Sequence, residues 1–203
     1  MATVLENEQS PQEPELDSPR IKMTLQEFNA LEEDPVVDRM LIRGELWEKP
    51  MTKRNRWHAQ VEARIAQLLS NWCDGLPQPR GGVFSGEVGC EFPDLETGFG
   101  IDIAYFSSET LARQNPDGKY LVGAPVLAVE VLSPSEQKEE IDAKVRSYLD
   151  GGVRLIWIVD YTFQTVTQYR PEEHPQMFSG DAELSAESDL PGFSVPVSAL
   201  FER

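Results

Sequence analysis

The chain is short of the residues that usually build metal-binding and redox motifs. Its 203 residues include only two cysteines, Cys73 and Cys90, and two histidines, His58 and His174. The cysteines do not form a CxxC pair, which argues against a zinc knuckle and favours two reduced thiols. P-loop, GxGxxG and GxSxG patterns are also missing, so nothing supports a phosphate-binding loop, a dinucleotide fold or a serine-nucleophile elbow.

Long apolar runs are missing too. No segment approaches the roughly 20 apolar residues that a membrane-spanning helix requires. Residues 1–20 are acidic and lack the basic and apolar regions of a signal peptide. We therefore expect a cytoplasmic protein with no membrane partner.

Positive charge is scarce, because 35 acidic residues face 18 lysines and arginines and give a formal net charge of −17. Proteins that bind nucleic acid usually present a basic face, so this balance argues against such a ligand. Residues 1–19 carry five acids and no base, and residues 171–203 carry seven acids and one base. The middle of the chain keeps a local basic group just before an expected helix, formed by Lys49, Lys53, Arg54 and Arg56.

Composition predicts an acidic tail followed by one domain. Residues 1–20 combine Glu, Pro, Gln and Ser with almost no large apolar side chains, so burial cannot offset the entropy lost on ordering them. We expect these residues to be disordered. The remaining residues, 21–203, are expected to form a single domain, which is long enough to bury one core.

Local patterns predict a mixed α/β chain. Thr24 and Glu27 have the spacing of a capping box before a short helix, and Gly44 is a candidate turn that splits residues 40–48 into a hairpin. Apolar residues at three- and four-residue spacing predict an amphipathic helix over residues 57–73. Strands are expected over residues 81–92, 100–106, 125–132, 155–159 and 165–169, with another helix over 141–149.

Two of these strands, residues 100–106 and 125–132, are almost continuously apolar, which is typical of central strands buried on both faces. After Arg170 the chain becomes acidic and loop-like. Residues 190–201 are then expected to dock back onto the core through Phe193, Val195, Val197, Leu200 and Phe201.

Each of the two apolar strands carries one acid, Asp102 in the first and Glu130 in the second. A carboxylate in such a setting is costly unless it is paired or bound to a metal ion, so both residues need an explanation. Mg²⁺ prefers oxygen ligands and is usually held by one or two carboxylates together with water and substrate phosphate. The two acids are therefore candidate ligands, with the main-chain carbonyl of Val131 as a third.

Other polar residues compete for roles in the same site. Lys144 falls on the expected helix after Glu130, where it could reach the cation and an attacking water, although a solvated position is the plainer interpretation. His58 opens the long helix, where we expect a surface or capping contact and, as the alternative, a further site residue. Ser133 lacks the elbow and the histidine partner that a serine nucleophile needs.

The run from Ala128 to Ser135, followed by Lys144, Gly151-Gly152 and the strand that ends at Asp160, resembles the Uma2 family. That family is similar to the restriction-endonuclease-like nucleases of the PD-(D/E)xK superfamily. Further landmarks occur in the same order along the chain: Met23 to Phe28, Gly44 to Leu46, Leu190 to Phe193 and Leu200-Phe201.

The resemblance implies an α/β fold, with a restriction-endonuclease-like αβββαβ core and a mixed central sheet. It matches the motif acids to Asp102 and Glu130. The superfamily lysine would fall at Leu132, so Lys144 on the following helix is the natural substitute. Ile101 stands where the family usually shows proline, which should alter a turn more than a ligand.

We therefore expect an endodeoxyribonuclease that uses Mg²⁺, with Mn²⁺ as a substitute, to hydrolyse phosphodiester bonds in DNA. Asp102 and Glu130 would bind the metal ion and Lys144 would position the water; a homodimer is left open. One alternative is a non-catalytic binding module that keeps the nuclease fold. Another is a metal-dependent hydrolase of a different phosphate ester.

Overall fold

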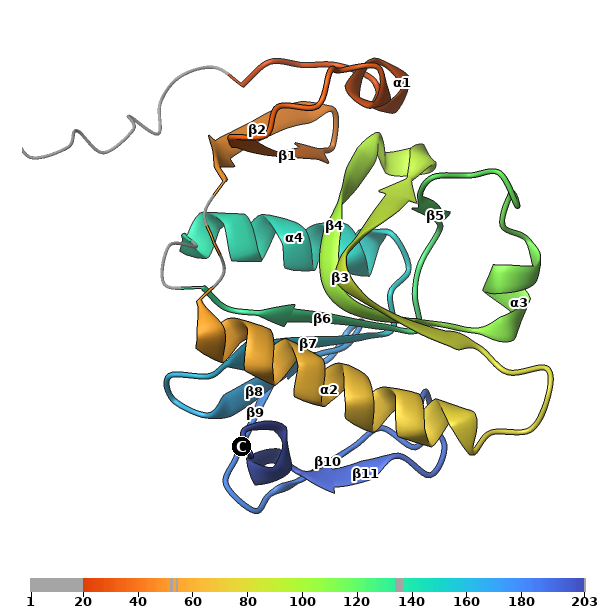
Figure 1. Ribbon diagram of the computed structural model, residues 1–203, viewed down its shortest axis with the longest axis vertical. Coiled ribbons are helices and arrows are strands. Elements are labelled where there is room, and N and C mark those ends of the chain that lie inside the picture. Colours follow the sequence, from red (N-terminus) through yellow and green to blue (C-terminus); the bar gives the residue numbers. More distant parts are fainter. Residues whose placement is uncertain (1–19, 52, 54, 134–136, 203) are drawn as a thin grey trace, which may run out of the picture.

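A mixed sheet forms the centre of the molecule in the computed structural model, which describes residues 20–51, 53, 55–133 and 137–202 (Figure 1). Its strands are β1 (Val37–Ile42), β2 (Glu45–Pro50), β3 (Gly82–Phe92), β4 (Thr97–Phe106), β5 (Leu121–Val122), β6 (Leu127–Val131), β7 (Leu155–Asp160), β8 (Thr165–Tyr169) and β9 (Gln176–Ser179). The order is β2-β1-β4-β6-β7-β8-β9, and β3 pairs with β4 and β5. The β6–β7 and β3–β5 pairs are parallel and the others antiparallel, which confirms the mixed sheet.

Two long helices cover opposite faces of this sheet (Figure 1). They are α2 (Arg56–Asp74) and α4 (Lys138–Asp150); shorter elements are α1 (Leu25–Asn29), α3 (Ser108–Ala112) and the 3₁₀ segments η1 (Pro93–Leu95) and η2 (Val197–Leu200). The apolar spacing that predicts α2 places Val61, Ile65 and Leu69 against the sheet. On the other face, Val145 and Tyr148 of α4 pack in a second apolar cluster.

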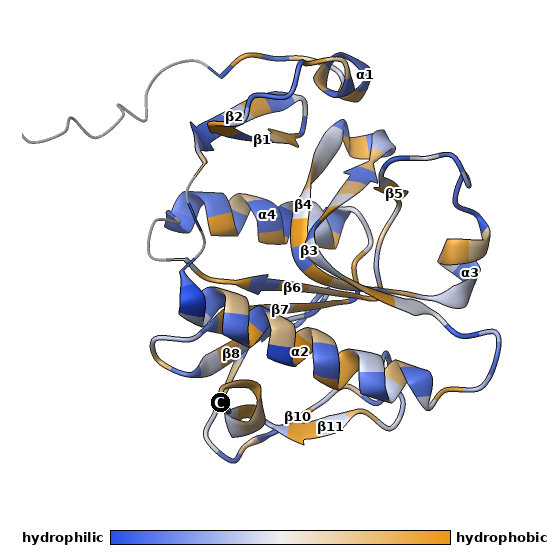
Figure 2. Cartoon of the chain, viewed as in Figure 1, coloured by the Kyte–Doolittle hydropathy of each residue, from blue (hydrophilic) through white to orange (hydrophobic). Residues whose placement is uncertain are grey.

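The central strands are the most apolar part of the chain, as Figure 2 shows for β6 and β7. Every residue of β6 is buried, and all but one residue of β4 are buried. Both strands lie inside the sheet, between β1 and β7. The predicted central position of both strands is confirmed, and it is the reason that any charge on them is enclosed by protein.

The N-terminal part of the domain follows its local sequence signals. The hydroxyl of Thr24 accepts a hydrogen bond from the Glu27 main chain, and the Glu27 carboxylate accepts one from the Thr24 main chain, which confirms the capping box. β1 and β2 form the predicted hairpin. Its turn places Arg43 and Gly44 at positive φ, as a two-residue hairpin turn of type I′ requires.

The expectation of loop structure after Arg170 is wrong in part, because this segment contributes β9 to the sheet and forms a separate pair, β10 (Glu183–Ser185) with β11 (Ser194–Pro196). These strands are short and mostly polar, so they lack the apolar alternation that marks a strand. The predicted docking of residues 190–201 is confirmed, with Phe193, Val197 and Leu200 buried against the α2 face.

The predicted tail falls outside the described residues, apart from its last position. Arg20 lies with its guanidinium carbon 3.3 Å from the ring centre of Trp47, and it also pairs with Glu139 at 3.3 Å. The domain therefore makes its first described contacts at Arg20.

Candidate active site

The hydrogen-bonded pairing between β4 and β6 stops next to Asp102, which leaves an opening between the two strands. The antiparallel pairing of β4 with β6 ends at Ile103 and Val129, and one further step in that register would place Asp102 opposite Glu130. The Asp102 carboxylate instead accepts a hydrogen bond from the Val131 main-chain N–H, with 2.8 Å between Oδ2 and N. A buried N–H without its ladder partner is thus satisfied by a side chain, which fixes the carboxylate at the opening.

The other neighbour of β4 is irregular at the same position. Ser85 of β3 pairs with Ile103 and Val88 pairs with Ile101, so that two residues, Gly86 and Glu87, stand opposite Asp102 in a β-bulge. Gly86 has a φ of +90° and Glu87 a φ of +55°. Bulges of this kind redirect groups near functional sites.

The bulge also positions a carboxylate that the sequence analysis did not single out. The Gly86 main-chain N–H donates to Glu62 Oε1 at 2.8 Å. Glu62 lies on α2, one turn after His58, and its Oε2 is 3.7 Å from His58 Nε2. The α2 helix and the bulged strand together therefore bring a second carboxylate to the Asp102 side of the sheet.

His58 lies between these two carboxylates. Its Nε2 is 3.5 Å from Asp102 Oδ1, and one ligand atom from each of His58, Glu62 and Asp102 lies within 4.8 Å of the others. The expectation of a surface contact is wrong, because His58 is 1% exposed. The reason is its place on α2: His58 precedes Val61 and Ile65 at helical spacing and shares their buried face.

Glu130 is enclosed by hydrogen-bond donors from α4. Lys144 Nζ donates to Glu130 Oε2 at 2.8 Å, and the Tyr148 hydroxyl donates to Oε1. Burial raises the pKa of Glu130 to about 7, and the negative charge of Asp102 acts in the same direction, whereas Lys144 and Tyr148 act against it. Burial and the Glu130 charge likewise raise the pKa of Tyr148 well above its ordinary value.

Lys144 is not on a solvated face. Its side chain is buried, with only 7% of the residue exposed, and its ammonium lies 5.8 Å from the ring centre of Phe99. Lys144 and Tyr148 are four residues apart and therefore lie on one side of α4, facing the sheet. The structure thus brings Asp102, Glu130 and Lys144 into one buried group, with His58 beside it.

Glu62 and Tyr148 also contact this group, and their sequence spacing indicates both. Glu62 stands four residues after His58, and Tyr148 stands four residues after Lys144, so each pair shares a helix face. The Val131 main chain also belongs to the site, through its N–H. Its carbonyl as a metal ligand stays a prediction.

The remaining candidates lie apart from this chemistry. His174 is exposed in a loop before β9. Cys73 and Cys90 are free and buried, and burial raises the pKa of Cys90 to about 12, so its thiol stays protonated at neutral pH.

The local basic group before α2 is reduced by pairing. Lys49 forms ion pairs with Asp38 at 3.5 Å and with Glu140. Lys53 and Arg56 are exposed, and Arg54 lies outside the described residues. Among the described members of the group, Lys53 and Arg56 therefore remain at the surface, before and at the start of the helix that carries His58.

The architecture is a mixed α/β fold built on a large mixed sheet. The crystal structure of "a putative nuclease belonging to DUF820" from Anabaena variabilis superposes with a TM-score of 0.75, covering 88% of this chain and 97% of that one. Since the two sequences are 24% identical, the likeness shows the shared fold.

A model of the Uma2 family, described as "Putative restriction endonuclease", matches residues 25–198. The chain therefore belongs to the Uma2 family, as its sequence landmarks predict. No curated protein matches the chain. Within the described part, no helix combines the length and apolar character needed to cross a membrane.

Proposed function

We propose that this protein is a metal-dependent endonuclease that hydrolyses phosphodiester bonds in DNA. The observation that carries the proposal is the convergence at Asp102 of two polar groups from opposite sides of the sheet. His58 and Glu62 reach it from α2, and Glu130 with Lys144 lies at the neighbouring position of β6. The Uma2 membership supports the same reaction class.

The residues present fit a divalent cation. Asp102 and Glu62 offer carboxylate oxygens, and His58 offers a ring nitrogen, within one small volume. Carboxylates suit Mg²⁺ and Mn²⁺, whereas an imidazole ligand favours a transition-metal ion over Mg²⁺. We therefore assign the cation to Asp102, Glu62 and His58, propose Glu130 on the neighbouring strand as a further ligand, and take Mn²⁺ as the first ion to test beside Mg²⁺.

Each side chain then has a defined task. A bound cation would polarise the scissile phosphate and lower the pKa of the attacking water. Lys144, held against Glu130, would orient that water and offset the negative charge that develops on the phosphate oxygens. The water gives up one proton as its oxygen forms a bond to phosphorus, the bond to the leaving sugar oxygen breaks, and that oxygen takes up one proton, so the number of protons is unchanged.

The acidic surface sets a condition on this function. The formal net charge of −17 opposes the approach of a polyanion. Lys53 and Arg56, exposed before and at the start of α2, are the nearest described cations in sequence to His58. We propose that they guide the backbone of the substrate toward the opening at Asp102.

Cleavage of supercoiled plasmid and linear duplex DNA tests the proposal, in Mn²⁺, in Mg²⁺ and in EDTA. Asp102→Asn, purified identically, controls for a contaminating nuclease. Nicking or linearisation by the wild type with a divalent cation, and none by Asp102→Asn, is the expected result. Equal cleavage by both proteins would overturn it.

Two further outcomes separate the alternatives. Mn²⁺ binding with hydrolysis of bis(p-nitrophenyl) phosphate, but no DNA cleavage, would point to a hydrolase of another phosphate ester. Absence of both metal binding and hydrolysis would favour a binding module that keeps the nuclease fold.

A further inference from the structure

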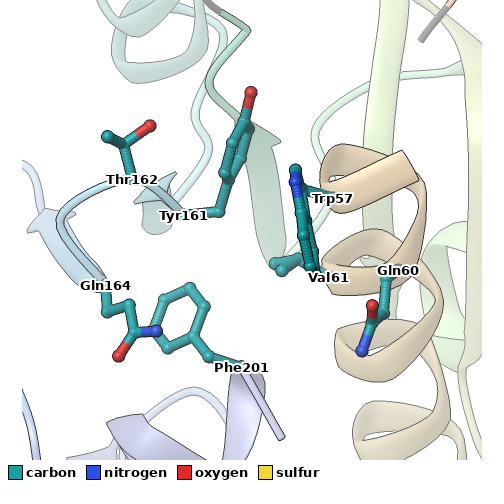
Figure 3. A pocket seen from close by; sticks show the side chains of 7 residues that line it. All are labelled: Trp57, Gln60, Val61, Tyr161, Thr162, Gln164 and Phe201. Atoms are coloured by element: carbon teal, nitrogen blue, oxygen red, sulfur yellow. The ribbon is translucent and has the colours of Figure 1, made fainter. Parts of the chain in front are cut away.

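A pocket opens beside the first turn of α2, the turn that also carries His58 (Figure 3). Its volume is about 340 Å³, toward the lower end of the range typical of small-ligand sites, which is about 300–1,000 Å³. Its lining comes from three segments distant in sequence: Trp57, Gln60 and Val61 of α2, Tyr161, Thr162 and Gln164 of the β7–β8 turn, and Phe201.

The lining combines flat aromatic surfaces with amide groups. Trp57 and Tyr161 stand on opposite sides of the opening, and Phe201 lies beside Gln164 (Figure 3). Gln60 and Gln164 each offer an amide donor and an amide acceptor. Rings that can stack, together with amides that can read polar edges, match a planar heteroaromatic ligand.

One residue ties this pocket to the proposed active site. Asn55 caps α2, accepting hydrogen bonds from the main-chain N–H groups of Trp57 and His58 at 2.9 and 3.0 Å. Its side-chain amide also donates to the Tyr161 hydroxyl at 2.7 Å. The same cap therefore holds the Tyr161 hydroxyl together with the main chain of Trp57 and of His58, whose imidazole lies 3.5 Å from Asp102.

Positive charge lies beside one of the pocket-lining rings. The Arg56 guanidinium carbon is 4.4 Å from the ring centre of Trp57, and Arg56 is exposed. Lys53 is exposed nearby in sequence. Aromatic platforms beside cations are the usual means of holding single-stranded nucleic acid, where bases stack and the backbone meets positive charge.

We propose that this pocket is a subsite for one unstacked nucleobase. The inference rests on the proposed nuclease function and deepens it. The base lies between Trp57 and Tyr161 while the backbone of the same strand passes Asp102 and Glu130. A base inside a duplex is stacked on its neighbours, so it enters only where the strand is single, frayed or mismatched, or where the base is turned out of the helix.

Binding of a labelled oligonucleotide tests the subsite, with Ca²⁺ replacing the active cation to block cleavage. The probe is a short single strand measured by fluorescence anisotropy, beside a duplex of the same sequence. Stacking is worth about 1–3 kcal/mol per base, so we expect Trp57→Ala and Tyr161→Ala to weaken single-strand binding by about 5- to 150-fold. Trp57→Phe, which keeps an aromatic ring, should restore most of the affinity.

A matched control lies in the same turn. Phe163 is 77% exposed and does not line the pocket, so Phe163→Ala should leave binding unchanged. A second readout distinguishes stacking from a general structural loss. 2-Aminopurine in the single strand should be quenched on binding to the wild type, and the quenching should disappear in Trp57→Ala.

The outcomes separate this inference from the function on which it rests. Wild-type DNA cleavage with unchanged single-strand binding in Trp57→Ala would remove the subsite and leave the nuclease. Quenching and Trp57-dependent binding without cleavage under any cation would keep the subsite and remove the nuclease. Failure of the wild type to bind either strand form would overturn the subsite.

Discussion

The two buried carboxylates of the site have different surroundings. Glu130 receives hydrogen bonds from Lys144 and Tyr148, so the protein itself supplies a positive charge and a donor beside it. Asp102 lies near a second carboxylate, Glu62, and an imidazole, His58. The first arrangement balances its charge within the fold, whereas the second concentrates ligand atoms. The comparison teaches that neighbouring acids on paired strands can differ in their partners: Glu130 is also held by the lysine, whereas Asp102 is surrounded by further candidate ligands.

The largest effect should follow from removing the shared ligand. Asp102→Ala is expected to abolish Mn²⁺ binding and to reduce DNA cleavage by orders of magnitude, because Asp102 belongs to both polar groups. Glu130→Ala should also weaken binding, but less, since His58 and Glu62 remain. Isothermal titration calorimetry with Mn²⁺ measures both, and unchanged isotherms for the two variants would refute the site.

Removing the lysine should give the next effect. Lys144→Ala is expected to reduce cleavage by orders of magnitude, while Lys138→Ala, an exposed position on the same helix, serves as the control. Because Lys144 is buried against Glu130, its loss leaves that carboxyl without its positive partner and should also lower the free energy of unfolding of the metal-free protein, most strongly above pH 7, where the carboxyl is charged. A solvated lysine, which is the plainer interpretation of the sequence, would leave folding unchanged in this variant.

Stability and chemistry can be separated for this pair. The double variant Glu130→Gln with Lys144→Met carries no buried charge at these positions and should recover much of the lost stability without recovering cleavage. Equal cleavage losses in Lys144→Ala and Lys138→Ala would indicate a general basic face instead. Urea unfolding and plasmid cleavage, run on the same preparations, supply both measurements.

A smaller effect should appear as a pH dependence of stability. Glu130 has a pKa of about 7 in the folded protein against an ordinary value of 4.5, so at intermediate pH the folded state holds a proton that the unfolded state has released. The free energy of unfolding in EDTA should therefore fall as pH rises from about 4.5 to about 7, by on the order of 3 kcal/mol.

Glu130→Gln isolates this contribution, because glutamine resembles the protonated acid. Its stability relative to the wild type should increase between pH 5 and pH 8, measured by denaturant unfolding at each pH. Parallel curves for the two proteins would show that Glu130 keeps an ordinary pKa and that Lys144 balances it fully.

The smallest effect concerns charge far from the site. Residues 1–19 contribute five negative charges, so a chain that starts at Arg20 should bind duplex DNA more tightly at low salt. The advantage should shrink as ionic strength approaches 0.1 M, where the Debye length is about 10 Å. Fluorescence anisotropy of a labelled duplex, recorded in Ca²⁺, measures the affinity of both chains. A difference in affinity that persists at high salt would exclude a charge effect.

Much of the fold could be predicted because its signals are local. The capping box at Thr24, the turn at Gly44 and the spacing of α2 each lie within a few residues. β9, β10 and β11 could not be predicted in this way, because they are strands through their pairing with distant segments and not through their composition. The same limit applies to the β3 bulge, which is defined only against β4.

The site residues also differ in whether their signal is local or depends on distant segments. Asp102, Glu130 and Lys144 are visible as charges in or after apolar strands, and the structure places them together. Glu62 is not visible in this way, because its place depends on the bulge that turns the Gly86 N–H toward it. The sequence predicts a surface or capping contact for His58, because the burial of this residue depends on how α2 rotates against the sheet.

The bulge opposite Asp102 also bears on where the chain can gain or lose a residue without losing activity. Side chains of a strand alternate between faces, so one added or deleted residue in β4 or β6 would turn an acid to the wrong face. The bulge already accommodates one extra residue in β3, at Gly86 and Glu87. Length changes should be accepted in the loop between α3 and β5 and rejected within β4 and β6 when variant libraries are selected for activity.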